Sequence, residues 1–361
     1  MSRTILQRAG WVAMAVLVSS ACTVDKGRVD EGAAASVVAP DLCTPRQCGE
    51  NSPVIDGLGF HEQNLKGVAN KEGLWIAPKK ARAQIVQRGM SYDLNVSNNQ
   101  ITGSRNNVTL LSGNALEGSV ITIESATAKY SLKIQKVRPL QFVAPPNTWL
   151  ETYQLAWAKE HDDHFVNLCG GVPLLHDEGL DDLGKAAPEL MNMTIWEAVV
   201  FEGDRIDTFF KTMSRTANDD WFTIGCATSA PAKLLLTRHT IHTQSAPSRA
   251  WEQRQAMLKM YVADYCNTGE SFTVARQKLV WMSSTFLYAF PAWKLEARWT
   301  ETGAKCLNNP RMLYPSTSLG AVEFPDIYAA LDAAGCHPPI CTNLDPLAFD
   351  GADRVSSNPM P

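Results

Sequence analysis

Side chains that could bind a metal ion gather in one polar stretch of the sequence. It contains His161, Asp162 and His164, and His176 and Asp177 follow nearby. A metal site needs neutral imidazoles and carboxylates that converge on one point. The His-x-x-His spacing serves a metal best on a helix, whereas this stretch is typical of a turn. We therefore favour a solvated turn over a metal site and predict no metal.

The carboxylate of Asp264 is a candidate for catalysis, because it lies beside the phenol of Tyr265 in the sequence. It could equally hydrogen-bond a neighbouring loop or strand and hold a helix in place, and no partner that would make it reactive is visible. His239 and His242 are interpreted as solvated turn residues. The chain has no Gly-x-Ser-x-Gly elbow, no phosphate-binding glycine loop and no zinc-protease helix motif. No catalytic residue and no cofactor is therefore predicted.

The thiol of Cys22 is a candidate for covalent lipid attachment. Arg3 and Arg8 precede an apolar run at residues 9–18, which is too short to span a bilayer because spanning needs about 20 apolar residues. Ser-Ala directly before Cys22 is typical of a bacterial lipoprotein signal, in which the cysteine is acylated and becomes the new N-terminus. Residues 1–21 are therefore predicted to be a signal peptide. The alternative is ordinary cleavage near Ala21, which leaves a soluble periplasmic or secreted protein.

The cysteine count supports the lipid interpretation. The chain has nine cysteines, and acylation of Cys22 leaves an even number for disulfides in an exported protein. A thiol redox centre at Cys43 and Cys48 is disfavoured, because four residues separate them and redox pairs usually have two. The cysteines expected in disulfides are Cys43, Cys48, Cys169, Cys226, Cys266, Cys306, Cys336 and Cys341.

Composition favours a folded, exported chain. Apolar residues make up 45% of the sequence and charged residues 19%, which is enough for a core and too little charge for disorder. The formal net charge is −4, and cleavage of a leader with two arginines would make it −6. An acidic balance argues against nucleic acid or anionic lipid as a partner.

Two regions are predicted between the signal peptide and residue 149. Residues 22–53 lack periodicity and are predicted to be a linker. Residues 54–145 are predicted to form a small β-rich domain, because alternating and β-branched stretches recur between turn-forming asparagines and glycines. Pro145 and Pro146 mark the predicted boundary between this domain and the next.

The main predicted helix covers about residues 248–266. Apolar side chains recur there at three- and four-residue steps, and Ser248 can cap the start of the helix. Gly269 can adopt the left-handed conformation that ends a helix. Cys266 is then expected in the last turn. The polar residues expected on the opposite side are Glu252, Arg254, Gln255 and Lys259.

Strands and a second helix are predicted after the main helix. Residues 293–299 alternate, and Glu296 and Arg298 are interpreted as an exposed pair. Residues 313–342 are predicted to contain a helix at 326–334 and a cysteine pair, and residues 343–361 a flexible tail. The sequence thus predicts an α+β, β-rich fold with antiparallel sheets, in which the main helix packs against a sheet and is disulfide-linked to it.

Four consecutive residues in this region, Ala263, Asp264, Tyr265 and Cys266, carry a family resemblance together with the cysteines around them. Their order resembles the ADYC domain, a family of exported bacterial proteins, chiefly myxobacterial, that is named for the tetrapeptide. The resemblance covers about residues 149–312 and implies a fold unit without implying an activity. Within that unit we favour the disulfides Cys169–Cys226 and Cys266–Cys306, and the four outer cysteines would pair among themselves.

The chain departs from the family pattern at two cysteine positions. Family members usually have cysteines where this chain has Leu234 and Met257. If those cysteines normally bond to each other, the loss of both leaves no unpaired thiol, and the two apolar side chains can fill the same space. The Gly-Tyr-x-Pro-Trp run that is usual in the family is replaced here by Thr237-Arg238-His239-Thr240.

Two classes of function remain. The first is a lipid-anchored, disulfide-braced protein of the cell envelope that binds or scaffolds an envelope protein or a glycan. The chain contains ten tryptophans, which suit a core or an aromatic contact surface. The second class is a secreted hydrolase with an unrecognised active site. Binding is the preferred interpretation, with the membrane contacted through the N-terminal lipid and no nucleic acid as partner.

Overall fold

The computed structural model shows an α+β, β-rich fold in which every strand pair among the described residues is antiparallel, as predicted. The chain divides into two units, residues 1–38 and 39–361, and all described residues belong to the second. The described residues are 49–50, 59–141, 148–169, 193, 196–216, 218–227, 229–242, 250–273, 278–283, 295–310, 327–344 and 355–359.

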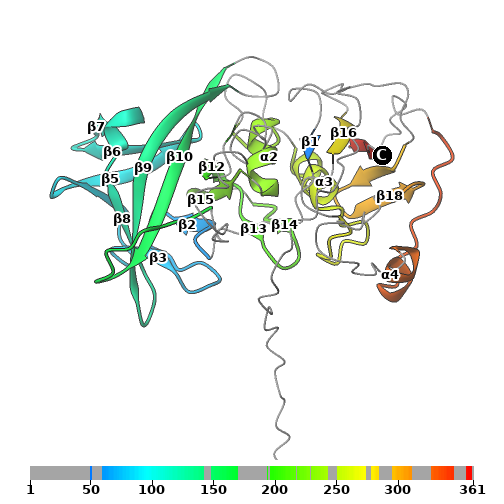
Figure 1. Ribbon diagram of the computed structural model, residues 1–361, viewed down its shortest axis with the longest axis horizontal. Coiled ribbons are helices and arrows are strands. Elements are labelled where there is room, and N and C mark those ends of the chain that lie inside the picture. The colour runs from blue at the N-terminus through cyan, green and yellow to red at the C-terminus, as the bar shows by residue number, and fades with distance from the viewer. Residues whose placement is uncertain are drawn as a thin grey trace, which may run out of the picture. The chain divides into compact units, whose positions relative to one another are not determined.

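A twelve-stranded sheet contains most of the described strands (Figure 1). Its main path runs β2-β15-β12-β10-β9-β8-β4-β5-β6-β7, while β11 pairs with β10 and β3 with β8. The strands are β2 (Glu62–Asn64), β3 (Trp75–Ile76), β4 (Gln84–Gln87), β5 (Met90–Ser97), β6 (Gln100–Arg105), β7 (Val108–Leu111), β8 (Val120–Glu124), β9 (Lys129–Gln141), β10 (Trp149–Lys159), β11 (Val166–Asn167), β12 (Glu197–Gly203) and β15 (Asn218–Cys226).

Asparagine pairs form the tight turns of this sheet. Asn98 and Asn99 join β5 to β6 with φ values of 51° and 61°, and Asn106 and Asn107 join β6 to β7 with 51° and 62°. Two successive residues with positive φ match the twist of a two-residue hairpin, and asparagine tolerates that conformation well. A short 3₁₀ helix, η1 (Gly113–Leu116), precedes β8.

The expected domain boundary at Pro145 and Pro146 does not separate two sheets. β9 and β10 pair along their lengths, from Gln141 opposite Trp149 to Tyr130 opposite Lys159. The two prolines fall in the connection between these paired strands, which lies outside the described residues. The predicted boundary at residue 145 was wrong, because the strands on its two sides pair with each other. Alternation within each stretch predicts a strand, but it does not predict which strand it pairs with.

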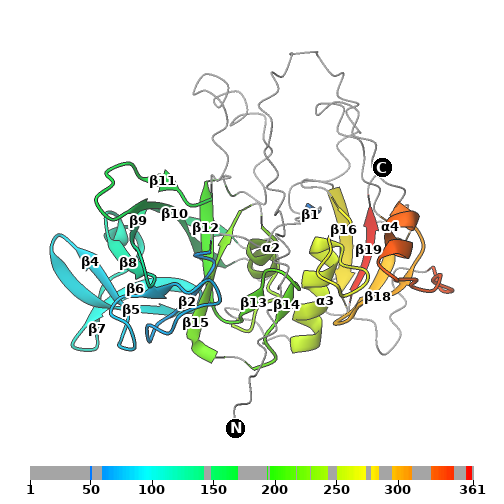
Figure 2. The same ribbon diagram turned by 90° about the horizontal axis from the view of Figure 1, so that it is seen from below.

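A five-stranded sheet has the order β1-β16-β19-β17-β18 (Figure 2). Two of its strands come from regions predicted to be a linker and a flexible tail. β19 lies between β16 and β17, which corrects the prediction for that part of the tail. The sequence of β19, Val-Ser-Ser-Asn-Pro, carries no apolar alternation that would predict a strand. The strands are β1 (Gly49–Glu50), β16 (Lys278–Ser283), β17 (Ala297–Thr300), β18 (Gly303–Leu307) and β19 (Val355–Pro359).

The described helices are α2 (Ala230–Leu236), α3 (Trp251–Val262) and α4 (Ile327–Ala333). α4 is the predicted helix at 326–334. The main helix is shorter than predicted, with Ala250 as its N-cap, and Ser248 lies outside the described residues. It ends at Val262 because Ala263 adopts the left-handed conformation, with φ 51°. The amide of Asp264 donates to the carbonyl of Lys259 at 3.0 Å, which closes the helix in a Schellman-type turn.

The polar residues of α3 do not form the exposed side that the sequence predicted. Arg254 is 3% exposed and Lys259 is fully buried, and Gln255 is buried as well. Arg254 and Gln255 have buried partners from distant segments: Arg254 pairs with Asp204 at 2.8 Å, and Gln255 accepts the amide of Met213 at 2.7 Å. The amphipathic expectation failed because these partners are not visible in the sequence of the helix itself.

Three disulfides connect the described cysteines: Cys169–Cys226, Cys266–Cys336 and Cys306–Cys341. The Cys169–Cys226 bond confirms a prediction. The predicted Cys266–Cys306 bond is wrong, and so is the predicted pairing of the outer cysteines among themselves. The segment around α4 brings Cys336 to Cys266 and Cys341 to Cys306. Cys22, Cys43 and Cys48 lie outside the described residues. Among the helices of the described part, none has the length and apolar character needed to span a membrane.

Candidate functional site

The residues Ala263 to Cys266 form a buried turn after α3, and each of them fixes a different contact. Ala263 supplies the left-handed turn, and Cys266 bonds to Cys336. The carboxylate of Asp264 accepts hydrogen bonds from the Lys259 ammonium at 2.6 Å and from the amides of Thr268 and Gly269 at 3.0 and 2.9 Å. Asp264 is fully buried, so its oxygens hold the helix to the following loop.

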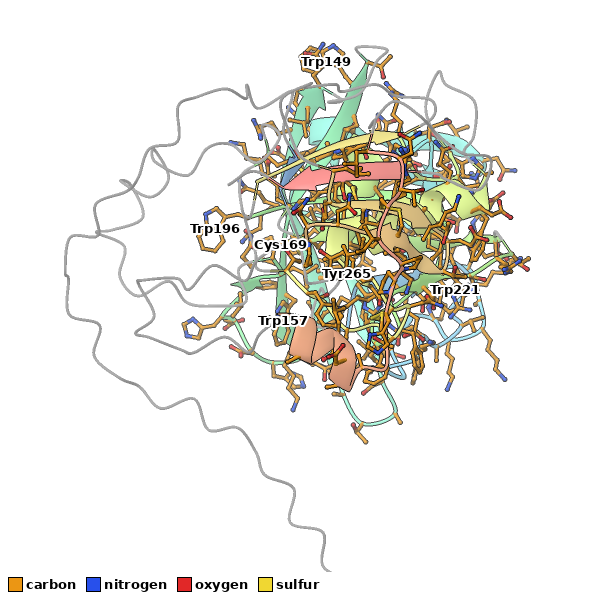
Figure 3. All side chains as sticks on the ribbon, turned by 90° about the vertical axis from the view of Figure 1, so that its right-hand side faces the viewer. Trp149, Trp157, Cys169, Trp196, Trp221 and Tyr265 are labelled. Carbon is orange, nitrogen blue, oxygen red and sulfur yellow. A yellow bond between two sulfur atoms is a disulfide. The ribbon has the colours of Figure 1, made fainter. Side chains whose placement is uncertain are left out.

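Tyr265 connects this turn to the five-stranded sheet. Its hydroxyl donates to Glu296 at 2.5 Å, and the hydroxyl of Ser357 in β19 donates to the other oxygen of Glu296 at 2.6 Å. The ring of Tyr265 stacks on Trp299, with centroids 5.2 Å apart. The indole of Trp299 donates to Ser357 at 2.7 Å, which completes the network. Figure 3 shows Tyr265 within the body of side chains.

The prediction that Glu296 and Arg298 form an exposed pair was therefore wrong. Glu296 is fully buried and Arg298 is 4% exposed. Glu296 holds Tyr265 and Ser357, while the guanidinium of Arg298 donates to the carbonyl of Asn343 at 3.2 Å. Strand alternation predicts an exposed face only where one face of the sheet meets water, and here both side chains are covered.

Two lysines share the neighbourhood of Asp264. Burial lowers the pKa of Lys259, and the carboxylate of Asp264 opposes that shift. Burial also lowers the pKa of Lys211, and the carboxylate of Asp264 opposes this shift as well. The Lys211 ammonium donates to the hydroxyl of Ser271, and Lys259 also donates to the carbonyl of Phe210 at 3.0 Å. The motif is thus a buried polar network with a structural role.

This network supports an exposed aromatic turn, the phenylalanine turn, which covers residues 207–211 between β13 (Ile206–Asp207) and β14 (Thr212–Met213). Phe209 is 74% exposed and Phe210 52%. The carboxylate of Asp207 accepts the amides of both phenylalanines at 2.9 and 2.8 Å. A Cβ at Gly269 would lie 2.1 Å from the Phe209 carbonyl oxygen, so the loop after the motif needs glycine to pack against this turn.

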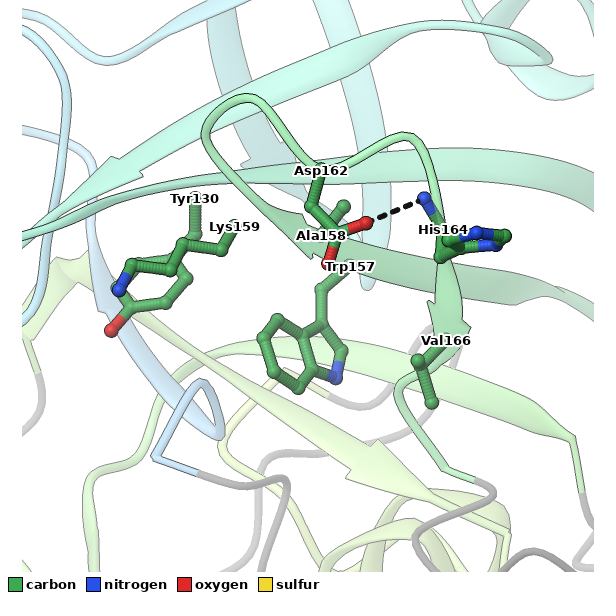
Figure 4. Close-up of a pocket in the computed structure, with 7 residues that line it drawn as sticks. All are labelled: Tyr130, Trp157, Ala158, Lys159, Asp162, His164 and Val166. Atoms are coloured by element: carbon green, nitrogen blue, oxygen red, sulfur yellow. Dashed lines mark hydrogen bonds between the residues drawn. The ribbon is translucent and has the colours of Figure 1, made fainter.

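A pocket of about 390 Å³, the aromatic pocket, lies on the face of β10 at its C-terminal end (Figure 4). Alternation puts Trp157 and Lys159 on one face, Tyr130 lies opposite Lys159, and Val166 lies opposite Trp157. Polar side chains from the following turn complete it. The pocket is lined by Tyr130, Trp157, Ala158, Lys159, Asp162, His164 and Val166.

Trp157 is the larger of the two aromatic side chains that line this pocket. The half-buried indole packs at 6.0 Å from the ring of Tyr130 and at 5.7 Å from that of Phe60. Its Nε1 is buried and has no hydrogen-bond partner among the described residues. A buried donor without an acceptor is costly, and therefore a ligand oxygen that reached it would gain a hydrogen bond.

The residues considered for metal binding do not converge. His164 lines the aromatic pocket with Asp162, whose carboxylate accepts the His164 amide at 2.9 Å, while His161 is outside that lining and has φ 69°. No group of three or more His, Cys, Asp or Glu residues in the described ranges could hold a metal ion. His176 and Asp177 lie outside the described residues.

The other two histidines differ from each other. His239 is fully buried beside Trp281, with ring centroids 5.6 Å apart, which corrects the prediction of a solvated turn. Its Nδ1 lies 3.3 Å from the hydroxyl of Thr237. His242 is the more open of the two, with a 40% exposed side chain and Nε2 3.1 Å from a carboxylate oxygen of Asp219. Helix α2, which precedes His239, is buried along its length, and its sequence was not predicted to be a helix.

One protein family matches the part of the chain that contains the motif and the aromatic pocket. The family model of the ADYC domain matches residues 113–313, which is more than half of the chain. The chain belongs to the ADYC domain family. No curated protein and no solved structure matches the chain.

The matched ADYC domain begins earlier than the predicted start at residue 149. It includes β8 and β9, which agrees with the continuous pairing of β9 and β10. Two of its cysteines, Cys266 and Cys306, bond to Cys336 and Cys341 beyond the matched residues. Leu234 and Met257 are fully buried in one hydrophobic cluster, which agrees with their filling the space of two family cysteines.

Sequence reasoning missed the aromatic pocket of the ADYC domain. In the sequence, Tyr130 and Trp157 each belong to a stretch in which large apolar side chains stand at every second position. The missing information was the register, because only the pairing of Tyr130 with Lys159 puts the two aromatic rings on one face. The signal that was available is the polar turn at residues 160–164, which directly follows the aromatic strand.

Proposed function

We propose that this ADYC-domain protein is a lipid-anchored protein of the cell envelope that binds a glycan in the aromatic pocket. The observation that carries the proposal is Trp157, whose ring lines one pocket of the described part of the chain and whose buried indole N–H has no hydrogen-bond partner among the described residues. Sugar rings present C–H groups that pack on aromatic faces, and their hydroxyls need several polar partners.

The other groups that line the pocket fit the same ligand class. Lys159 can donate, the carboxylate of Asp162 can accept, and His164 can do either. Ligand pockets typically combine apolar and aromatic walls with a few polar groups, in volumes of about 300–1,000 Å³. A pocket of about 390 Å³ is large enough for one or two sugar units.

The proposed compartment is supported by the cysteines and by the N-terminal sequence. Disulfides persist in oxidising compartments outside the cytosol, and all six described cysteines are paired. The sequence around Cys22 has the order of a lipoprotein signal. Stable anchoring by lipid takes more than one acyl chain, which an acylated N-terminal cysteine provides.

Calorimetric titration of the mature chain with soluble peptidoglycan fragments and with maltose tests the glycan proposal. We expect saturable binding of one of them, and a loss of about tenfold or more in affinity for Trp157→Ala, because an aromatic contact and a hydrogen bond are removed. Trp149→Ala is the matched control, since Trp149 is on the same strand, is 61% exposed and projects outward (Figure 3).

Two results would count against glycan binding. One is the absence of heat with every saccharide, and the other is an equal loss of affinity in the Trp149 and Trp157 variants. Release of reducing sugar ends during the titration would instead favour the alternative, a secreted hydrolase.

Membrane fractionation tests the anchor separately. The wild-type chain is expected in the membrane fraction, and Cys22→Ser is expected in the soluble fraction because it has no thiol to acylate. Equal recovery of both forms in membranes would refute the lipid anchor and leave the pocket proposal intact.

A contact with an envelope protein is the second candidate function, and the phenylalanine turn favours it. Asp207 and Lys259 bind the backbone of two adjacent, exposed phenylalanines, and aromatic side chains on a fixed backbone suit a protein contact. A photoreactive group at position 209 should give a discrete cross-linked product in cells. The same group at Val108, also exposed, is the control, and identical products at both positions would contradict this role.

A further inference from the structure

A second pocket, the basic pocket, has a volume of about 490 Å³ and is lined by side chains from the β2–β5 region and by Asp220 of β15. Its charged lining is Lys66, Lys80, Arg82 and Asp220. Leu65, which is partly buried, and Ala81, which is exposed, contribute apolar surface. Three cations and one carboxylate therefore line a single concavity in a chain whose formal net charge is −4.

The backbone holds the two loops of the basic pocket closely together. The amide of Lys80 donates to the carbonyl of Gly67 at 3.1 Å, and that of Ala83 to Leu65 at 2.7 Å. Gly67 has φ 61°, and a Cβ there would lie 2.5 Å from the carbonyl oxygen of Pro78. Only glycine fits where the backbone at residue 67 approaches the backbone at residues 78–80. The cationic side chains therefore extend from a backbone of fixed conformation.

The cations of the basic pocket are not fully neutralised by their neighbours. Lys66 pairs with Asp220 at 2.6 Å. Arg82 donates to the amide oxygen of Asn95 at 2.7 Å, and its Nε is 3.7 Å from Asp93. Lys80 has no side-chain partner among the described residues. Like charges in one concavity repel each other, and a bound anion would relieve that repulsion.

We propose that the basic pocket binds a small molecule that carries a phosphate monoester. A phosphate monoester has a charge of about −2 near neutral pH, and the three cations of the lining outnumber Asp220 and the neighbouring Asp93 by one. The fork of Arg82 can contact two phosphate oxygens and the lysines act as point charges. The pocket is larger than phosphate alone needs, and Leu65 and Ala81 would contact the organic part, for which a hexose is the right size.

Titration calorimetry at constant ionic strength tests this proposal with four probes: inorganic phosphate, glucose 6-phosphate, glucuronate and glucose. The whole mature chain is expected to bind glucose 6-phosphate most tightly and inorganic phosphate more weakly, with glucose silent. Lys80→Glu/Arg82→Glu should lower the affinity for glucose 6-phosphate by about tenfold or more, because two attractive charges become repulsive.

Arg105→Glu/Lys136→Glu is the charge-matched control, since both residues are exposed and lie outside the basic pocket. It should bind glucose 6-phosphate as the wild type does. Equal binding by both double variants would overturn the site, as would the absence of saturable binding of any phosphate. Glucuronate binding as tight as that of glucose 6-phosphate would overturn the assignment to phosphate. Trp157→Ala should leave this titration unchanged, which separates it from the glycan proposal.

Discussion

The strands from β3 to β11 of the large sheet and the region around α3 use charged side chains in opposite ways. In the large sheet, the cluster that contains Ile85, Leu94 and Leu155 is apolar, and charged side chains lie around the two pockets. Around α3, charged groups are inside: Lys259 and Asp264 are fully buried and paired with each other, and Glu296 is buried against Tyr265. The strands from β3 to β11 thus keep their charged side chains at least partly exposed, and the helix region buries charged side chains in contacts that hold the fold together.

This difference assigns the family motif a structural role, and the proposed ligand sites lie outside it. A buried charge is tolerated only with a partner, and removal of one partner leaves the other unpaired in a low-dielectric environment. Changes in the motif should therefore lower stability, whereas changes in the pockets should lower affinity. The expected losses of stability differ in size, and the largest belongs to the buried ion pair of the motif.

Asp264→Asn should give the largest loss of stability. Lys259 would remain buried beside a neutral side chain, and breaking a buried pair typically costs about 3–5 kcal/mol of unfolding free energy. Urea unfolding of the oxidised protein measures this. Asp162→Asn, an exposed residue of the aromatic pocket, is the matched control and should change stability by less than about 0.5 kcal/mol. Similar losses in both variants would remove the contrast between the two regions.

Removal of the Cys266–Cys336 disulfide should rank next. The bond closes a loop with a sequence separation of 70, and Cys266→Ser/Cys336→Ser is expected to cost about 2–4 kcal/mol. Peptide mapping of the oxidised protein checks the pairing itself. Recovery of a Cys266–Cys306 peptide would contradict the observed disulfides.

Tyr265→Phe should have an intermediate effect. It removes the hydroxyl donor to Glu296 and leaves that buried carboxylate with one fewer hydrogen bond, a loss of about 1–3 kcal/mol. Tyr130→Phe, in the aromatic pocket, is the control and should be close to neutral in urea unfolding. An equal loss in the two variants would show that Tyr265 has no special structural role.

The smallest effect concerns the pH dependence of stability. Burial raises the pKa of Glu202, although the amides of Asn99 and Asn98 oppose the shift. The folded state therefore holds this proton more tightly than the unfolded chain does. Its stabilising contribution is complete below the ordinary pKa of 4.5 and is lost as the pH rises through the raised value.

Glu202→Gln cannot lose that proton, so its stability should fall less than that of the wild type between about pH 4 and about pH 7. Urea midpoints across this range give the comparison. Glu160→Gln, on an exposed turn, should follow the wild type. A Glu202→Gln curve parallel to the wild type would exclude the proposed linkage.

Local features of the sequence were sufficient to predict most of the long strands, the asparagine turns and the helix at 326–334. The prediction of an exposed side on α3 failed because Arg254 and Lys259 have partners, Asp204 and Asp264, that the helical pattern does not reveal. A charged residue predicts exposure only when no opposite charge is folded against it.

Helix α2 and the length of α3 were also missed, and most of the other errors concern long-range pairing. β19 and Cys336 and Cys341 come from the C-terminal part of the chain, and nothing in their local sequence indicates which strand or thiol they meet. The same limitation hid the aromatic pocket, since Tyr130 and Trp157 share a face only in the observed register. Periodicity predicts the elements, and the register between distant elements needs the structure.

A double-mutant cycle on Lys259 and Asp264 tests the structural role of the motif most directly. Urea unfolding of Asp264→Asn, Lys259→Met and the combined variant would be compared with the wild type. We predict that the combined variant is more stable than Asp264→Asn alone, because it no longer buries an unpaired ammonium, and that glycan affinity is unchanged in the folded combined variant. Additive losses of stability, or lost glycan affinity in the folded protein, would contradict a purely structural motif.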